Sequence, residues 1–390
     1  MLAGVLRRRG GPETPPVTSM ELFFDLVYVF AVTQLSRYLY DHLTARGALE
    51  TLVLFLAVWW AWNYTAWATN WIDPDTSPVR VLLLGLMLLS LIMSAAIPEA
   101  FGSRGLAFAG AYVAIQLVRS GFMVAAFGRE RMGRNYAQLL AWSAIAAVFW
   151  LAGAAVHGDA GLAVWIVALA VDYGAPMHGF WLPGAGRTPT RDWTLAGGHL
   201  AERCRLVLLI ALGESILAVG VTFAALTWSR SVLTAFVVGF VGTVSLYWIY
   251  FGGRSARAGE VIERAEDPTR IGRTGYAYAH GIMVGGVIVV AVGIELTISH
   301  ATGATSAAAA WAILAGPAVY LAGNSLFKIT LSRTPPVSRL VAIAVLALLA
   351  PLALVVDPLA LSAAAAAVTV TLAIVLGRSR AGEVAAVEGP

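Results

Sequence analysis

The stretch MELFFDLVYVFAVTQLSRYL, residues 20–39, has the length and apolar content of a membrane-spanning helix, yet it contains Glu21, Asp25 and Gln34. A span needs about 20 predominantly apolar residues. An ionisable side chain near its centre costs roughly 2.5–3.5 kcal/mol on insertion scales, so it needs a partner or a purpose. Glu21 and Asp25 share one helix face, whereas Gln34 lies on another face near the middle of the span. We therefore expect this helix to lie inside a bundle, with polar surroundings on more than one side.

The composition of the chain indicates a polytopic membrane protein. Of 390 residues, 59% are hydrophobic and 12% are charged, whereas soluble domains carry about 25% charged residues. The net charge of +4 does not predict a nucleic-acid partner, because the basic residues are scattered between apolar segments and form no patch. Cys204 is the single cysteine, which excludes an internal disulfide and a cysteine-based metal site. The six histidines are dispersed, and we expect neither a metal nor a cofactor.

The fold class predicted is all-α, a polytopic transmembrane helix bundle of about 12 spans. Only Asp357 and Pro358 separate the last two apolar segments, so these could form one broken hairpin and the count could be as low as about 10. The segments are 21–41, 49–70, 79–98, 105–127, 135–155, 161–181, 200–226, 231–252, 274–298, 305–327, 338–356 and 358–377.

The distribution of arginines predicts the topology. Basic residues gather in alternate loops, beginning with Arg7, Arg8 and Arg9, whereas the other loops hold few. By the positive-inside rule both termini are cytoplasmic. Glu21 then lies at the cytoplasmic edge, where the helix N-terminus favours an anion. The predicted organisation is a tail 1–19, a six-helix half 20–182, a cytoplasmic loop 183–199, a second half 200–377 and a tail 378–390.

The two halves resemble each other. WWAWNY (59–64) in the second segment corresponds to LYWIYF (246–251) in the eighth, and Glu202 opens the seventh segment as Glu21 opens the first. The spacing from Met87 to Glu99 equals that from Met283 to Glu295. We predict a 6+6 parallel internal repeat, with chance similarity in Ala- and Leu-rich sequence as the alternative.

Further polar residues fall inside predicted spans. Glu214 lies near the middle of 200–226, and its neighbours Gly213 and Ser215 leave room for close helix packing or water. Arg119 and Asp172 lie midway along their segments. We expect a central cluster in which Arg119 neutralises Glu214, Asp25 or Asp172. The alternative is that these groups form structural ion pairs that fix helix register.

An aromatic group occupies the second segment: Trp59, Trp60, Trp62, Tyr64, Trp67 and Trp71. One interpretation is interfacial anchoring and lipid-facing packing. The other is an aromatic wall for an organic or cationic ligand.

ELFFDLVYVFAVTQLS in the first segment and ERCRLVLLIALGESI in the seventh resemble the two signatures of the bacterial low temperature requirement A family. The resemblance covers essentially the whole chain and implies a polytopic inner-membrane protein of a family named for a cold-growth phenotype. The resemblance does not imply any particular biochemical activity. It points to Glu21, Phe24, Asp25, Gln34, Glu202, Arg203, Gly213, Glu214 and Ser215.

Three functions stay open at this level. The first is a secondary transporter of unknown substrate, binding a proton or small molecule in a polar intramembrane site. The second is a membrane enzyme acting on a lipid or isoprenoid, with Asp25 or Glu214 as general acid. The third is a non-catalytic sensor or membrane-adaptation protein. The absence of a Walker A loop excludes an ATP-driven pump acting alone. The lipid bilayer is the expected partner, and the oligomeric state is open.

The candidate substrate- or ion-binding residues are Asp25, Gln34, Asn63, Arg119, Asp172, Glu202, Arg203, Glu214 and Ser215.

Overall fold

The computed structural model describes residues 4–7, 16–156, 158–189, 193, 195–252 and 268–388. Twelve helices within these ranges are long and apolar enough to cross a membrane. The predicted all-α transmembrane bundle is therefore confirmed. The last two apolar segments, Val337–Leu354 and Pro358–Ser379, each qualify as a span.

The helices divide into two compact units. Unit 1 comprises Met1–Tyr38, Ala45–Arg203 and Ile262–Gly272, and unit 2 comprises Leu39–Thr44, Cys204–Val261 and Arg273–Pro390. The predicted 6+6 repeat stays a prediction, as does the cytoplasmic location of the termini.

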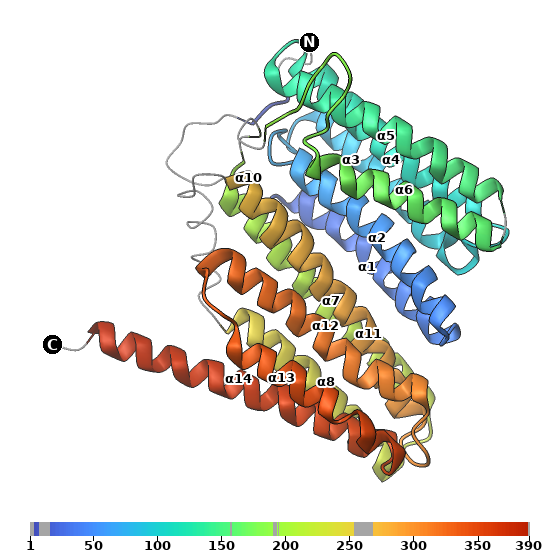
Figure 1. Ribbon diagram of the computed structural model, residues 1–390, viewed down its shortest axis with the longest axis vertical. Helices are drawn as coiled ribbons and strands as arrows, with labels where there is room; N and C mark the ends of the chain where they lie inside the picture. The colour runs from blue at the N-terminus through green and yellow to red at the C-terminus, as the bar shows by residue number, and fades with distance from the viewer. Residues whose placement is uncertain are drawn as a thin grey trace. The chain divides into compact units, whose positions relative to one another are not determined.

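Unit 1 contains the first six long helices (blue to green in Figure 1) and the first turns of the seventh. Within it α4 packs against α3, α5 and α2, and α6 packs against α5 and α2. The bounds are α1 Ser19–Asp41, α2 Ala45–Ala68, α3 Ser77–Ala96, α4 Gly105–Phe127, α5 Arg131–Ala155, α6 Asp159–Met177, α7 Gly197–Ala225 and the short α10 Pro268–Ile271.

Aromatic side chains fill the interior of unit 1. Trp60, Trp62, Trp150 and Trp165 are among its largest fully buried side chains, and Trp60 stacks on Tyr173 with ring centroids 3.9 Å apart. Large rings supply much of the packing contact in such a core. The expectation that the tryptophans of the second segment face lipid is therefore wrong for Trp60 and Trp62.

The N-terminal segment is packed against unit 1. Leu6 forms an isolated antiparallel bridge with Ile72 just after α2, and the Arg7 amide donates to the Trp71 carbonyl at 2.8 Å. Val5 is buried. Part of the sequence predicted as a tail thereby brings Arg7 against the helices.

Unit 2 contains the remaining long helices, of which α11 and α12 have the most extensive packing. A π-helical turn, Gly272–Tyr278, leads into α11, and a 3-10 turn, Ala350–Leu354, follows α13. α14 continues through most of the predicted C-terminal tail. The bounds are α8 Arg230–Phe251, α11 Ala279–Ser299, α12 Ala307–Ser332, α13 Val337–Leu348 and α14 Pro358–Glu388.

Glycines permit the close approach of α11 and α12. A Cβ atom on Gly316 of α12 would lie 2.7 Å from the Val290 amide nitrogen, and one on Gly286 of α11 would lie 2.5 Å from the Tyr320 amide nitrogen. Real Cβ atoms do not approach backbone so closely. Small residues in membrane helices allow this contact, since van der Waals packing rather than hydrophobic transfer holds helices together in lipid.

We predict that Gly316→Ala destabilises the protein by about 1–3 kcal/mol, because the added methyl group overpacks the α11–α12 contact. Gly220→Ala is the matched control, since a Cβ atom at this position of α7 meets nothing within 4 Å. The measurement is thermal unfolding in detergent. Equal unfolding temperatures for the two variants would contradict the close packing.

Candidate functional site

The side chain of Glu21 turns back to cap its own helix. Thr18 and Glu21 have the spacing of a capping box, in which a threonine at the N-cap and a glutamate three residues on satisfy each other's backbone amides. The Glu21 Oε2 atom accepts from the Thr18 amide at 2.9 Å and from its hydroxyl at 3.0 Å, and the Thr18 hydroxyl accepts from the Glu21 amide at 3.3 Å. The motif fixes the start of α1 and the direction of the carboxylate.

Arg203 of α7 binds Asp25 of α1 with two parallel hydrogen bonds. Its Nε donates to Oδ2 at 3.0 Å and its Nη2 donates to Oδ1 at 2.5 Å. The indole Nε1 of Trp62, on α2, donates to the same Oδ1 at 2.7 Å. Both ionic side chains are fully buried. This fork geometry is the strongest form of a guanidinium–carboxylate pair.

The same guanidinium also reaches Glu21. Its Nη1 donates to Glu21 Oε1 at 3.2 Å and to the Thr69 hydroxyl at 2.9 Å. Arg7 donates from Nη2 to Glu21 Oε2 at 3.0 Å and from Nε to the Thr69 carbonyl at 2.9 Å. Two carboxylates from one helix are thus held by two arginines from elsewhere in the chain. We call Arg7, Glu21, Asp25, His199 and Arg203 the ion-pair network.

His199 completes the network without needing a charge. Its Nε2 lies 2.9 Å from Glu21 Oε1, and its Nδ1 lies 3.4 Å from the Asn70 amide nitrogen. A neutral imidazole protonated on Nε2 donates to the carboxylate and accepts from Asn70, so both ring nitrogens are satisfied. With this tautomer the formal charges of two carboxylates and two guanidinium groups cancel.

A second buried polar chain runs through α4. Arg119 Nη2 donates to the Gln116 amide oxygen, Gln116 Nε2 donates to the Tyr112 hydroxyl at 2.8 Å, and this hydroxyl donates to Asp172 Oδ2 at 2.7 Å. Trp150 Nε1 donates to the same oxygen at 2.9 Å. Asp172 on α6 is thereby joined to Arg119 through two neutral side chains.

The predicted pairing of Arg119 with Asp25 or Asp172 is wrong. Asp25 takes its arginine from α7, and Asp172 is satisfied by a phenol and an indole. Arg119 instead contacts Gln116, the Ala61 carbonyl oxygen at 3.5 Å and the face of the Tyr64 ring at 5.1 Å. Asp25 and Glu214 belong to different compact units, so a site shared between the halves stays a prediction.

Glu21 and Arg203 are enclosed by protein, and the position of Glu21 at the cytoplasmic edge of the membrane stays a prediction. Both side chains are fully buried, and Arg203 lies within α7. The reason is mutual neutralisation, since each group is costly to bury without the other.

The other candidate residues have simpler surroundings. Asn63 is buried, and its side-chain oxygen has no hydrogen-bond partner in the described part of the chain. Ser215 is buried and donates to the Leu212 carbonyl of its own helix at 2.8 Å. Glu214 is buried, whereas Gln34 and Glu202 are half-buried. A Cβ atom on Gly213 would meet nothing within 4 Å, so close helix packing at Gly213 is not observed.

The sequence contains a signal for the pairing of α1 with α7 that the sequence analysis did not use. Glu21 and Asp25 are four residues apart on α1, and His199 and Arg203 are four residues apart on α7. Side chains at this spacing share a helix face, so an acidic face and a basic face of matching length were available to pair. Arg7 and the tryptophan donor Trp62 carry no comparable signal.

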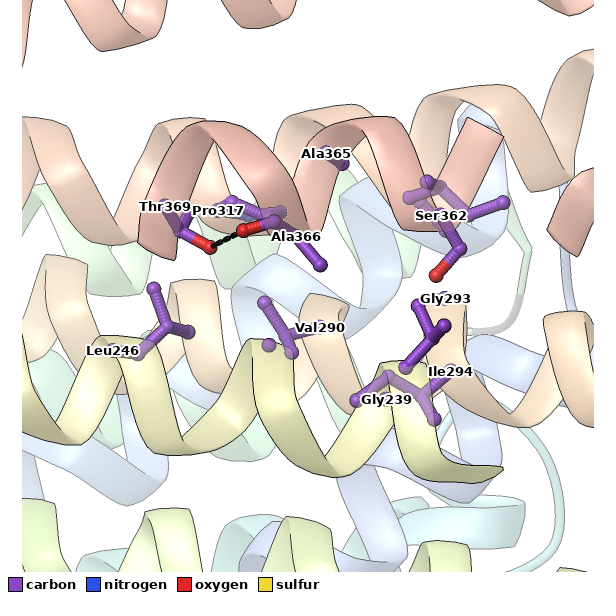
Figure 2. A pocket seen from close by; sticks show the side chains of 14 residues that line it. Gly239, Leu246, Val290, Gly293, Ile294, Pro317, Ser362, Ala365, Ala366 and Thr369 are labelled. Atoms are coloured by element: carbon purple, nitrogen blue, oxygen red, sulfur yellow. Dashed lines mark hydrogen bonds between the residues drawn. The ribbon is translucent and has the colours of Figure 1, made fainter. Parts of the chain in front are cut away.

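A groove in unit 2 is lined by small and apolar residues from α8, α11, α12 and α14 (Figure 2). The Thr369 hydroxyl donates to the Ala366 carbonyl of its own helix at 3.0 Å (Figure 2) and accepts from the Ser245 hydroxyl of α8 at 2.7 Å. Among the residues that the structure describes, no ionisable side chain lines it. The groove could enclose an apolar group but has no side chain for acid–base chemistry or ion binding. The ion-pair network is therefore the better candidate for a functional site.

We predict that Arg203→Lys destabilises the protein by about 1–3 kcal/mol, because an ammonium group cannot reproduce the fork on Asp25 and also reach Glu21. Arg80→Lys is the matched control, since Arg80 pairs with Asp75 and both side chains are exposed; we expect a change within about 0.5 kcal/mol. Chemical unfolding in detergent measures both. Equal losses of unfolding free energy in Arg203→Lys and Arg80→Lys would contradict the geometry of the network.

Comparison with known proteins places the chain in a family. The model of the family described as "Bacterial low temperature requirement A protein (LtrA)" matches residues 16–374. The chain is also 36% identical over 342 residues to a protein of Rhizobium meliloti (strain 1021) named "Uncharacterized protein RA0937", covering 87% of this chain and 83% of that one. No solved structure matches. The chain thus belongs to the bacterial low temperature requirement A family, and it is a multi-pass membrane protein.

Proposed function

We propose that the protein is a secondary transporter of the bacterial inner membrane, and that the ion-pair network of unit 1 is its coupling site for a proton or a small charged substrate. The observation that carries this proposal is the complete burial of Glu21, Asp25 and Arg203 within helices long enough to span a membrane. Ionisable groups inside membrane bundles mark ion pathways and proton relays in transporters and pumps.

A purely structural role explains the network less well. Replacing a buried ion pair by well-packed apolar side chains is often neutral or stabilising. Fixing helix register alone would therefore need fewer ionisable groups than two carboxylates, two guanidinium groups and an imidazole. The network residues lie on the N-terminal segment, α1 and α7, and Trp62 of α2 donates a hydrogen bond to Asp25, so that four elements meet at the network. Any change in its charge acts on all four.

The geometry suggests how such a change would act. Arg203 divides its donors between Asp25 and Glu21. Neutralising Asp25 by a proton would remove one half of this attraction and leave Arg203 bound to Glu21. Because uncompensated charge is costly in the membrane, the helices would respond by moving. Alternating exposure of a site near the membrane interior is the mechanism of secondary transport.

The test uses proteoliposomes adsorbed on a solid-supported membrane, with currents recorded on steps of pH and of a panel of carboxylates, amino acids, sugars and organic cations. We expect the wild-type protein to give saturable currents with one of these classes of compound. Asp25→Asn should reduce them by about tenfold or more, since it removes the charge that Arg203 binds.

Glu50→Gln is the control variant, because Glu50 is a buried acid outside the network that pairs with Arg46 and Tyr38. Each variant is first shown to be folded by circular dichroism. Unchanged currents in Asp25→Asn, or no current from folded wild-type protein with any compound, would contradict the transport proposal.

A further inference from the structure

Arg119 is a buried cation that the ion-pair network does not use. Its side chain is 1% exposed, in the middle of α4. A guanidinium group has five N–H donors, and the described residues accept from Arg119 at two points, the Gln116 amide oxygen and the Ala61 carbonyl oxygen. Both acceptors are neutral. In the described chain no carboxylate lies within ion-pair distance of this guanidinium.

The nearest acid connected to it is engaged elsewhere. Asp172 accepts from Tyr112 and Trp150 on one oxygen and reaches Arg119 only through Tyr112 and Gln116. Arg203, by contrast, holds one carboxylate directly in its fork. The same chain thus contains one arginine whose fork is filled by a carboxylate and one whose fork has no such group.

The surroundings of Arg119 favour a small organic anion. The guanidinium lies over the Tyr64 ring, which is itself half-buried. The ring leaves the polar edge of the guanidinium for hydrogen bonding while stabilising its charge. A planar guanidinium matches a carboxylate with two parallel hydrogen bonds, a fit that a spherical ion lacks.

We propose that Arg119 is the anchor of a substrate site for small monocarboxylates in unit 1, with Gln116 and Tyr64 beside the bound carboxylate. This inference rests on the proposed transport function and names the substrate class. Because Arg119 is almost fully buried, α2 and α4 must separate locally for the ligand to enter. A site closed in the empty protein and opened by helix movement is what alternating access requires.

The test is ligand-induced thermal stabilisation of the purified full-length protein in detergent. The probe is sodium lactate, with sodium chloride at equal ionic strength as reference and lactamide as the uncharged analogue. A ligand that binds only the folded state raises its unfolding temperature in a saturable manner. We expect a saturable rise of a few degrees with lactate, and none with chloride or lactamide.

Two variants assign the effect to Arg119. Arg119→Gln should abolish the lactate response. Gln116→Glu is nearly isosteric and places a carboxylate beside the guanidinium, so it should fill the fork internally and also abolish the response, although it loses the hydrogen bond that Gln116 donates to Tyr112. Arg104→Gln, at an exposed arginine, is the control that should retain it. If Arg119→Gln does not fold, the lactate response of Gln116→Glu alone tests the proposal.

No lactate response in the wild type, a response that chloride matches, or a response that persists in Gln116→Glu would overturn the proposal. The binding test is independent of flux. Lactate binding that depends on Arg119, without current in proteoliposomes, would refute transport and retain the anion site. Saturable current with another substrate class, without lactate binding, would refute the anion site and retain transport.

Discussion

The hydrogen bonds from Arg203 to Asp25 and Glu21 are the constraint on which unit 1 depends. They explain why an otherwise apolar helix keeps two acids near its start. Neither carboxylate could be buried alone, and the arginine could not be buried without them. The capping box at Thr18 aims Glu21, and Trp62 fixes one oxygen of Asp25. Local helix chemistry and long-range pairing therefore act on the same two side chains.

Unit 1 holds its buried charge in two arrangements that differ in kind. In the ion-pair network the charges are in direct contact, whereas in the α4 chain a phenol and an amide separate Arg119 from Asp172. Tyr28 of α1 belongs to neither arrangement, since its hydroxyl bonds Ser90 of α3 at 3.0 Å.

The sequence predicted the membrane class, the helical fold and the number of spans, because apolar length is a local property. It also identified Asp25, Arg119 and Asp172 as intramembrane polar residues. It did not predict which charges meet, since pairing between α1 and α7 depends on helix packing across a separation of 178 residues. The error over Arg119 arose from expecting that a buried guanidinium is neutralised by direct contact with a buried carboxylate. A neutral side chain such as Tyr112, which connects two charged groups by hydrogen bonds, cannot be recognised as a connector from the sequence.

The account depends on the energetic coupling of Asp25 and Arg203 more than on any other contact. A double-mutant cycle measures this coupling directly, from the unfolding free energies of wild type, Asp25→Asn, Arg203→Gln and the double variant in detergent. Contacting charged residues couple by about 0.5–3 kcal/mol, and for this buried fork we predict the upper part of that range, with the double variant less destabilised than the sum of the single ones. Losses that add within about 0.5 kcal/mol would contradict the pairing on which the structure of unit 1 rests.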